Sequence, residues 1–168
     1  MDRKKNTATE ILESQLSGFL NSTYALEEAD SGFRPTEDLM TVAQQFRHTW
    51  MTVKWFTDAA FTGKGFDMSF EEFERETKKA SSLTEERDRL KAVFNQSLDL
   101  WGTLTDEQIM ELMPDNPILG SAPKLALVTA CHDHTAHHRG ALTVYTRLLG
   151  KVPPMPYMDP EQQQGKTE

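Results

Sequence analysis

Apolar residues recur every three or four positions in four long stretches of the chain, the spacing expected for one face of an α-helix. These stretches cover residues 8–29, 42–61, 84–100 and 124–149. Thr41 and Gln44 have the spacing of a capping box at the start of the second stretch, and Ser82 or Thr84 suits the start of the third. No stretch of useful length alternates apolar and polar residues as a β-strand would. The pattern therefore predicts an all-α protein.

Glycine and proline mark the connections between these predicted helices. Gly32 and Pro35 follow the first helix, and Gly102 ends the third. The least regular connection is 61–82, which contains a short amphipathic segment after Ser69. Four long helices joined in this way predict a four-helix bundle with one long crossover connection.

The length of the chain suits a single domain, because 168 residues can bury a sufficient core without disulfides. We expect this domain to cover residues 1–168, with its core at about 8–154 and a polar C-terminal tail. The apolar faces exceed what one bundle of this size needs, since three tryptophans must be placed. A homodimer is therefore a further expectation.

The charge and the cysteine content exclude several classes of protein. A formal net charge of -8 argues against a nucleic-acid-binding surface, which would be basic. Cys131 is the only cysteine, which fits a reducing compartment. No stretch approaches the roughly 18 apolar residues of a membrane span, and the N-terminus lacks the apolar segment of a signal peptide. We expect a cytoplasmic protein that binds neither nucleic acid nor a membrane.

Four of the five histidines lie in the segment CHDHTAHHRG, residues 131–140. His134 and His138 are four residues apart and therefore lie on the same face of a helix. That face continues with mostly apolar residues: Leu127, Cys131, Ala141 or Leu142, Tyr145 and Leu148. Unpaired imidazoles are costly to bury, whereas neutral imidazoles are good ligands for divalent metals. The spacing predicts that His134 and His138 bind a metal ion.

The other three histidines are weaker candidates when the pattern is considered alone. His132 and His137 fall on other faces of the same helix, where a role around the metal ligands or at the surface is favoured. His48 lies on a mixed face of the second helix, and a lone histidine there is more often packed or exposed than a ligand. The alternative for the whole cluster is a solvated, histidine-rich helix face.

The order and spacing of these motifs resemble the DinB family of metal-binding proteins. The resemblance rests on MTVAQQFRHTW in the second helix and HTAHHRGALTVYTRLLGKVPP in the fourth, and it extends over about residues 11–154. It implies one divalent ion held by His48, His134 and His138. Nickel and zinc are the first candidates, followed by iron and manganese, because a three-histidine site accepts several ions. This chain has Ala141 where the family usually has Gln, so it lacks any polar contact that this Gln side chain makes.

Three neutral nitrogen ligands leave open positions on a metal, as in catalytic sites. Zincin proteases need a glutamate directly after the first histidine, and Thr135 stands there in this chain. A metal-bound thiol needs no separate base, and some DinB-like proteins are thiol S-transferases. The resemblance therefore implies transfer of a low-molecular-weight thiol, a small-molecule partner. Metal-dependent hydrolysis and non-catalytic, stress-related metal binding remain as alternatives.

Arg139 and Tyr145 are candidates for supporting roles beside the metal. Arg139 either forms an ion pair on the helix surface, which we favour, or binds a substrate anion. Tyr145 lies on the face of His138, two turns later, where it donates a hydrogen bond or packs. Cys131, one turn before His134, is expected to be a small core residue rather than a nucleophile.

Overall fold

The computed structural model describes residues 5–164, so part of the predicted C-terminal tail, 165–168, lies outside the described residues together with 1–4. The elements in chain order are α1 (Thr7–Ser22), η1 (Glu28–Asp30), α2 (Val42–Phe61), α3 (Phe70–Lys78), α4 (Leu83–Trp101), α5 (Asp106–Ile109), α6 (Leu125–Leu148) and α7 (Pro160–Gln164). The described part of the chain forms helices and no β-strand, which confirms the all-α prediction. Within it, no helix combines the length and the apolar character needed to cross a membrane.

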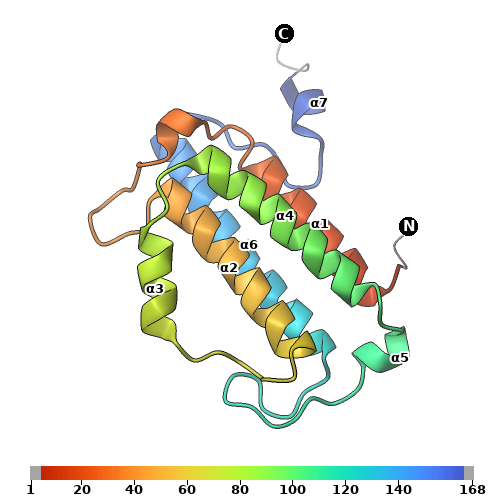
Figure 1. Ribbon diagram of the computed structural model, residues 1–168. Helices are drawn as coiled ribbons and strands as arrows, with labels where there is room; N and C mark the ends of the chain where they lie inside the picture. The colour runs from red at the N-terminus through yellow and green to blue at the C-terminus, as the bar shows by residue number, and fades with distance from the viewer. Residues whose placement is uncertain (1–4, 165–168) are drawn as a thin grey trace.

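The four long helices, α1, α2, α4 and α6, lie side by side (Figure 1). α1 and α2 each contact both α4 and α6, so every long helix has two long neighbours. α2 and α4 run in the same direction, because the connection between them returns the chain to the end where α2 began. This connection is the long crossover expected around 61–82, and its helix α3 packs on the outside of α2.

Several helix ends follow from the local signals in the sequence. Thr41 and Gln44 form the predicted capping box of α2, with hydrogen bonds of 3.2 and 2.9 Å between side chain and backbone. The hydroxyl of Ser82 accepts a hydrogen bond from the backbone N–H of Glu85 at the start of α4. Gly150 follows α6 with a φ of 74°, a conformation that favours glycine.

The first helix ends earlier than its apolar periodicity predicts. The prediction of a helix over 8–29 is wrong at its C-terminal end, since α1 stops at Ser22 and η1 follows. Arg87 of α4 donates hydrogen bonds to the carbonyl oxygens of Thr23 and Leu26, at 3.1 and 3.0 Å. Leu26 is itself buried. A cation suits the carbonyl end of a helix, so contacts with a distant element turn the chain here.

The interior of the bundle is built from large apolar side chains of all four long helices. Fully buried members include Leu12, Phe19, Phe46, Leu90, Phe94, Trp101, Leu127 and Leu142. Phe19 of α1 and Phe46 of α2 pack edge to face, with ring centroids 5.0 Å apart. On α6 most of the predicted interior face is buried, but Leu148 in the last turn is 59% exposed, so that expectation is wrong.

One carboxylate is buried between α2 and α4. Glu86 is 1% exposed, and its two oxygens accept hydrogen bonds from Arg47 Nε at 3.0 Å and Trp50 Nε1 at 2.7 Å. Arg47 also donates to the backbone oxygen of Glu76 in α3. A buried charge is tolerated only when it is paired and hydrogen-bonded. These contacts fix the turn of α2 that carries His48, the residue next to Arg47.

Replacing Arg47 should destabilise the protein strongly. We expect Arg47→Met to lower the free energy of unfolding by about 3 kcal/mol, because it leaves the Glu86 carboxylate buried without its cation. Urea unfolding measures the change. The matched control is Lys54→Met, which removes an exposed ion pair with Asp58 on the same helix and should cost no more than about 0.5 kcal/mol. Equal losses in the two variants would contradict this account of Glu86.

Candidate metal centre

Three histidines converge between α2 and α6. His48 projects from α2, and His134 and His138 project from successive turns of α6, the helix that packs beside it. The Nε2 atom of His134 lies 3.1 Å from that of His48 and 3.3 Å from that of His138. Among the described residues, these three form the group whose ligand atoms all lie within 4.8 Å of one another, and no carboxylate joins it.

The spacing of these nitrogen atoms suits a small divalent ion. Nitrogen ligands at about 2.0–2.1 Å from a tetrahedral ion stand about 3.3 Å apart from one another. The two Nε2 separations of 3.1 and 3.3 Å are close to that value. Three imidazole ligands of this kind can hold zinc, nickel or iron, so the donor set fits a divalent metal without identifying it.

The electrostatic surroundings keep the three rings neutral. Burial lowers the pKa of His48, His134 and His138, because a charged imidazole loses its hydration in the bundle. The pKa falls to about 4 for His134 and to about 3 for His138, with further lowering from the neighbouring histidines. Neutral imidazoles at pH 7 are the form that binds a metal.

A chain of hydrogen bonds sets the orientation of His138. The Tyr145 hydroxyl donates to the backbone oxygen of Met40 at 3.1 Å and accepts from Gln45 Nε2 at 3.5 Å. The amide oxygen of Gln45 in turn contacts His138 Nδ1. An amide oxygen can only accept, so this contact places the ring proton on Nδ1 and leaves the Nε2 lone pair facing the other two histidines.

Gln45 was not among the residues singled out from the sequence. Ala141, one turn beyond His138, has no polar side-chain atom, and the acceptor for the His138 ring N–H is Gln45 of α2. One signal was available: Gln45 lies three residues before His48, one turn away on the same side of the helix. The structure buries this polar side chain, which is 6% exposed. Tyr145, a predicted supporting residue, contacts the cluster through Gln45.

His132 and His137 lie outside the cluster. The exposed ring of His137 packs edge to face against His138, with centroids 5.1 Å apart. His132 lines a hollow against α1 with Glu10 and Ser14, on another side of α6. These positions agree with the different helix faces assigned from the sequence.

The other candidates on α6 face α1. The Arg139 guanidinium lies against α1, where a Cβ on Gly18 would come within 2.9 Å of it. Thr135 is buried and its hydroxyl accepts a hydrogen bond from Gln15 Nε2. Cys131 is buried on the same side, and burial raises the pKa of its thiol to about 11. The Cys131 thiol is therefore protonated at pH 7.

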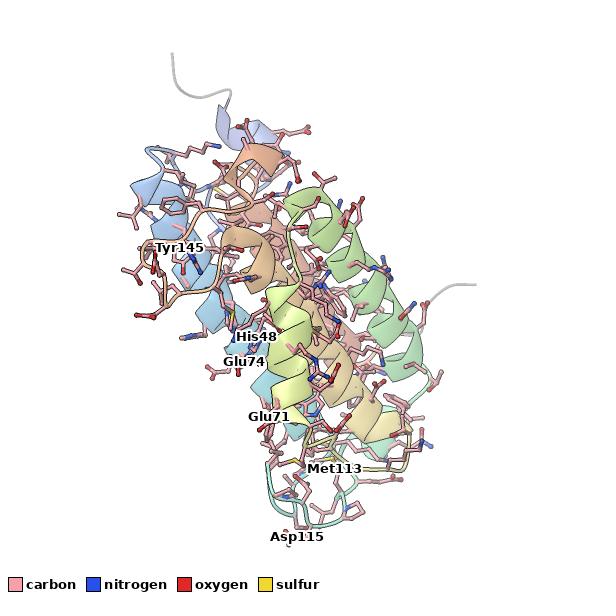
Figure 2. All side chains as sticks on the ribbon, turned by 60° about the vertical axis from the view of Figure 1, so that its left-hand side comes forward. His48, Glu71, Glu74, Met113, Asp115 and Tyr145 are labelled. Carbon is pink, nitrogen blue, oxygen red and sulfur yellow. The ribbon has the colours of Figure 1, made fainter. Side chains whose placement is uncertain are left out.

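Two cavities open beside the histidines, and α3 stands between them. The first, which we call the polar cavity, has about 570 Å³ and is lined by His48, Arg34, Asp38, Glu74 and Lys78, among others. The second, the aromatic cavity, has about 370 Å³, and His48 and His134 both line it. Phe70 and Phe73 of α3 border both cavities. Figure 2 shows His48 beside α3, at the level of Glu74.

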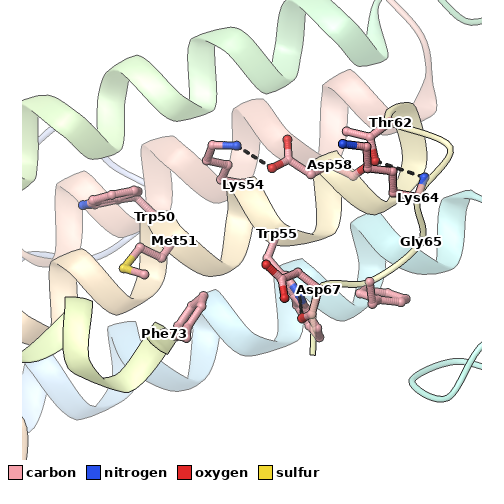
Figure 3. Close-up of a pocket in the computed structure, with 11 residues that line it drawn as sticks. Trp50, Met51, Lys54, Trp55, Asp58, Thr62, Lys64, Gly65, Asp67 and Phe73 are labelled. Atoms are coloured by element: carbon pink, nitrogen blue, oxygen red, sulfur yellow. Dashed lines mark hydrogen bonds and ion pairs between the residues drawn. The ribbon is translucent and has the colours of Figure 1, made fainter. Parts of the chain in front are cut away.

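A third hollow of about 560 Å³ runs along the outer side of α2 (Figure 3). Its lining includes Lys54, Asp58 and the segment 62–67, and it shares Trp55 and Phe73 with the aromatic cavity. None of the three clustered histidines lines this hollow. Trp55 and Phe73 therefore separate the outer surface of α2 from the candidate metal centre.

Comparisons with known proteins agree with the fold. A family model described as the DinB family matches residues 5–167. A DinB-like protein of Bacillus subtilis has a solved structure with a TM-score of 0.65 and 17% identity, covering 92% of this chain and 99% of its own. A second DinB-like protein, from Bacillus cereus, has a solved structure with a TM-score of 0.66 and 17% identity. The match covers 92% of this chain and 98% of that protein.

At 17% identity these structural likenesses show the fold alone. A search of curated proteins returned no match. The family model covers nearly the whole chain, including all three histidines of the cluster. This chain therefore belongs to the DinB family.

Proposed function

We propose that this protein is a metal-dependent enzyme that transfers a low-molecular-weight thiol to a small electrophile, with His48, His134 and His138 as the metal ligands. The observation that carries the proposal is the convergence of three neutral Nε2 atoms at 3.1 and 3.3 Å. A divalent ion supplies Lewis acidity that produces a thiolate or hydroxide nucleophile near pH 7. The remaining coordination positions are left for the substrate, as in catalytic sites.

The polar groups around the cluster favour thiol transfer over hydrolysis. Metal-dependent hydrolases commonly place a carboxylate near the ion, where it orients the attacking water and passes a proton to the leaving group. No carboxylate of the described residues joins the cluster. Glu74 lines the polar cavity with His48, but its carboxylate forms an ion pair with Lys78 at 2.6 Å. Thiol transfer would need no such carboxylate, because a divalent ion held by the three histidines would itself stabilise the thiolate.

The thiol must come from a small molecule. Cys131 is the only cysteine of the chain, and it is buried with its Sγ 3.5 Å from Gln15 Nε2, on the α1 side of α6. The polar cavity beside His48 carries both cations and carboxylates, from Arg34, Lys78, Glu37 and Asp38. Such a lining suits a thiol with both amino and carboxyl groups.

The first test combines metal content with activity. Protein purified without a nickel column and loaded with zinc should bind about one ion per chain. It should catalyse the reaction of cysteine with chlorodinitrobenzene, in which sulfur replaces chloride, chloride leaves and the thiol proton goes to solvent. We expect His48→Ala, His134→Ala and His138→Ala each to lose the bound metal and the activity. His132→Ala, the matched control on α6, should retain both.

The possible results separate the parts of the proposal. Metal binding without thiol transfer, together with zinc-dependent hydrolysis of an ester, would favour the hydrolase alternative. Metal binding without either reaction would favour a non-catalytic role. Retention of the metal by His48→Ala and its loss from His132→Ala would refute the assignment of the ligands.

The hydrogen bond that Gln45 accepts from His138 should strengthen metal binding. We expect Gln45→Leu to weaken zinc affinity by about 10- to 100-fold, because it removes the acceptor that orients His138. Gln45→Glu keeps a hydrogen-bond acceptor at this position and should weaken zinc affinity much less than Gln45→Leu. Tyr145→Phe should have a smaller effect than Gln45→Leu, since Tyr145 acts through Gln45. Competition against a chromophoric chelator measures the affinities, and equal values for wild type and Gln45→Leu would rule out this role.

The lowered pKa values predict how the metal-free protein responds to acid. Unfolded histidines take up protons below about pH 6.5, whereas His134 and His138 in the folded protein do so only near pH 4 and 3. The free energy of unfolding should therefore fall as the pH drops from about 6.5 to 4. In His138→Asn the free energy of unfolding should change less steeply with pH, by up to about 1.4 kcal/mol per pH unit. Urea unfolding in the presence of a chelator measures both slopes, and identical slopes would show that folded His138 ionises normally.

A further inference from the structure

The aromatic cavity differs in chemistry from the polar cavity on the other side of α3. Its walls are formed by Trp55, Phe56, Phe70, Phe73, Ile118 and Leu119. Thr52 and Ala130 complete the lining with the two histidines, and the Thr52 hydroxyl already donates to the backbone oxygen of His48. None of the residues that the structure places around this cavity is an Asp, Glu, Lys or Arg. A charged group would lose its hydration there without a partner.

The walls of this cavity are held in place before any ligand binds. Trp55 donates its indole N–H to the backbone oxygen of Asp67 at 2.7 Å, and its ring packs against Phe56 and Phe66. On the opposite wall, the side-chain oxygen of Asn116 accepts hydrogen bonds from the backbone N–H groups of Ile118 and Leu119. A preformed apolar pocket binds its ligand at a lower entropic cost.

The size and position of the cavity limit what can occupy it. Its volume of about 370 Å³ suits a small organic group rather than a peptide or a nucleic acid. Because His48 and His134 line it, a group seated there lies directly beside the candidate metal centre. Phe70 is 54% exposed at its border, so a ligand would cover apolar surface that water now contacts.

We infer that the aromatic cavity binds an aromatic or branched apolar group of the acceptor substrate. The inference rests on the proposed function, because it takes the three-histidine cluster as the place of reaction. The two substrates then bind in different cavities. The charged thiol occupies the polar cavity, beside Arg34 and Lys78, and the apolar acceptor occupies the aromatic cavity, beside Trp55. Phe73, whose ring packs edge to face on His48 at 5.3 Å, stands between them.

Two uncharged thiols of similar reactivity test the aromatic cavity in the zinc-loaded protein, used as probes that would bind the ion and not as the charged thiol substrate. Phenylmethanethiol carries an aromatic ring and mercaptoethanol does not. Burial of on the order of 100 Å² of ring surface should make phenylmethanethiol bind about 10- to 100-fold more tightly in calorimetric titrations. We expect Ala130→Leu, which fills the cavity, to reduce this ratio to about 3 or less. Ala136→Leu on the same helix, outside both cavities, is the matched control and should keep the ratio.

A second measurement does not depend on the metal. In metal-free protein, phenylmethanol should shift the indole N–H resonance of Trp55 in NMR spectra of the wild type but not of Ala130→Leu. Leu119→Trp provides a second filling substitution, placed in a connection rather than in a helix, should Ala130→Leu fold poorly. This variant should likewise reduce the ratio of the two thiol affinities, and phenylmethanol should no longer shift the Trp55 indole resonance.

The two measurements distinguish failure of the cavity from failure of the proposed function. Equal affinities for the two thiols, with no response of Trp55 to phenylmethanol, would overturn the inference while leaving the metal centre in place. If the zinc-loaded protein bound neither thiol but Trp55 still responded to phenylmethanol, thiol transfer would fail and the apolar cavity would stand. If Ala130→Leu and Leu119→Trp both kept the wild-type ratio of the two thiol affinities, the aromatic ring would bind outside this cavity and the inference would be overturned.

Discussion

The rest of the structure depends on the packing of α2 against α6, which brings three neutral imidazoles together with their Nε2 atoms 3.1 and 3.3 Å apart. Such a convergence is unfavourable in itself, because buried lone pairs face one another without enough protons between them. The buried Nδ1 of His134 adds a polar atom with no partner among the described residues. The bundle enforces this arrangement, and a bound cation would relieve it, which links metal binding to folding stability.

The surrounding contacts show how the fold holds the unfavourable cluster. The Glu86 carboxylate, buried against Arg47 and Trp50, ties α2 to α4 beside His48. Gln45 and Tyr145 hold His138 from the opposite side of the site. Local order at such a centre is maintained by the surrounding structure rather than by the ligands themselves. The residues around His48 and His138 therefore set the geometry of the cluster, although they are not part of it.

Local patterns in the sequence predicted the parts of the structure that depend on local interactions. The four-residue spacing of His134 and His138 placed them on one face, and Thr41 with Gln44 marked the start of α2. The end of α1 was predicted wrongly because Arg87, far along the chain, binds the carbonyl oxygens of Thr23 and Leu26 just beyond the helix. Gln45 was missed for the same reason, since its partners His138 and Tyr145 lie on another helix. His48 was predicted as a ligand only through the family resemblance, because nothing on its own helix distinguishes it from a packed histidine.

The helices and the connections have different roles in this molecule. The three clustered histidines and Gln45 all come from α2 and α6, whose relative position is set by the core. Part of the wall of the aromatic cavity comes from the crossover and from the connection after α5, through Phe70, Phe73, Ile118 and Leu119. Changes in those segments can reshape the cavities without moving the three clustered histidines, since connections tolerate substitution better than packed helices do. Proteins that share this arrangement of helices can therefore share a metal centre while acting on different substrates, and the reaction has to be inferred from the cavities rather than from the fold.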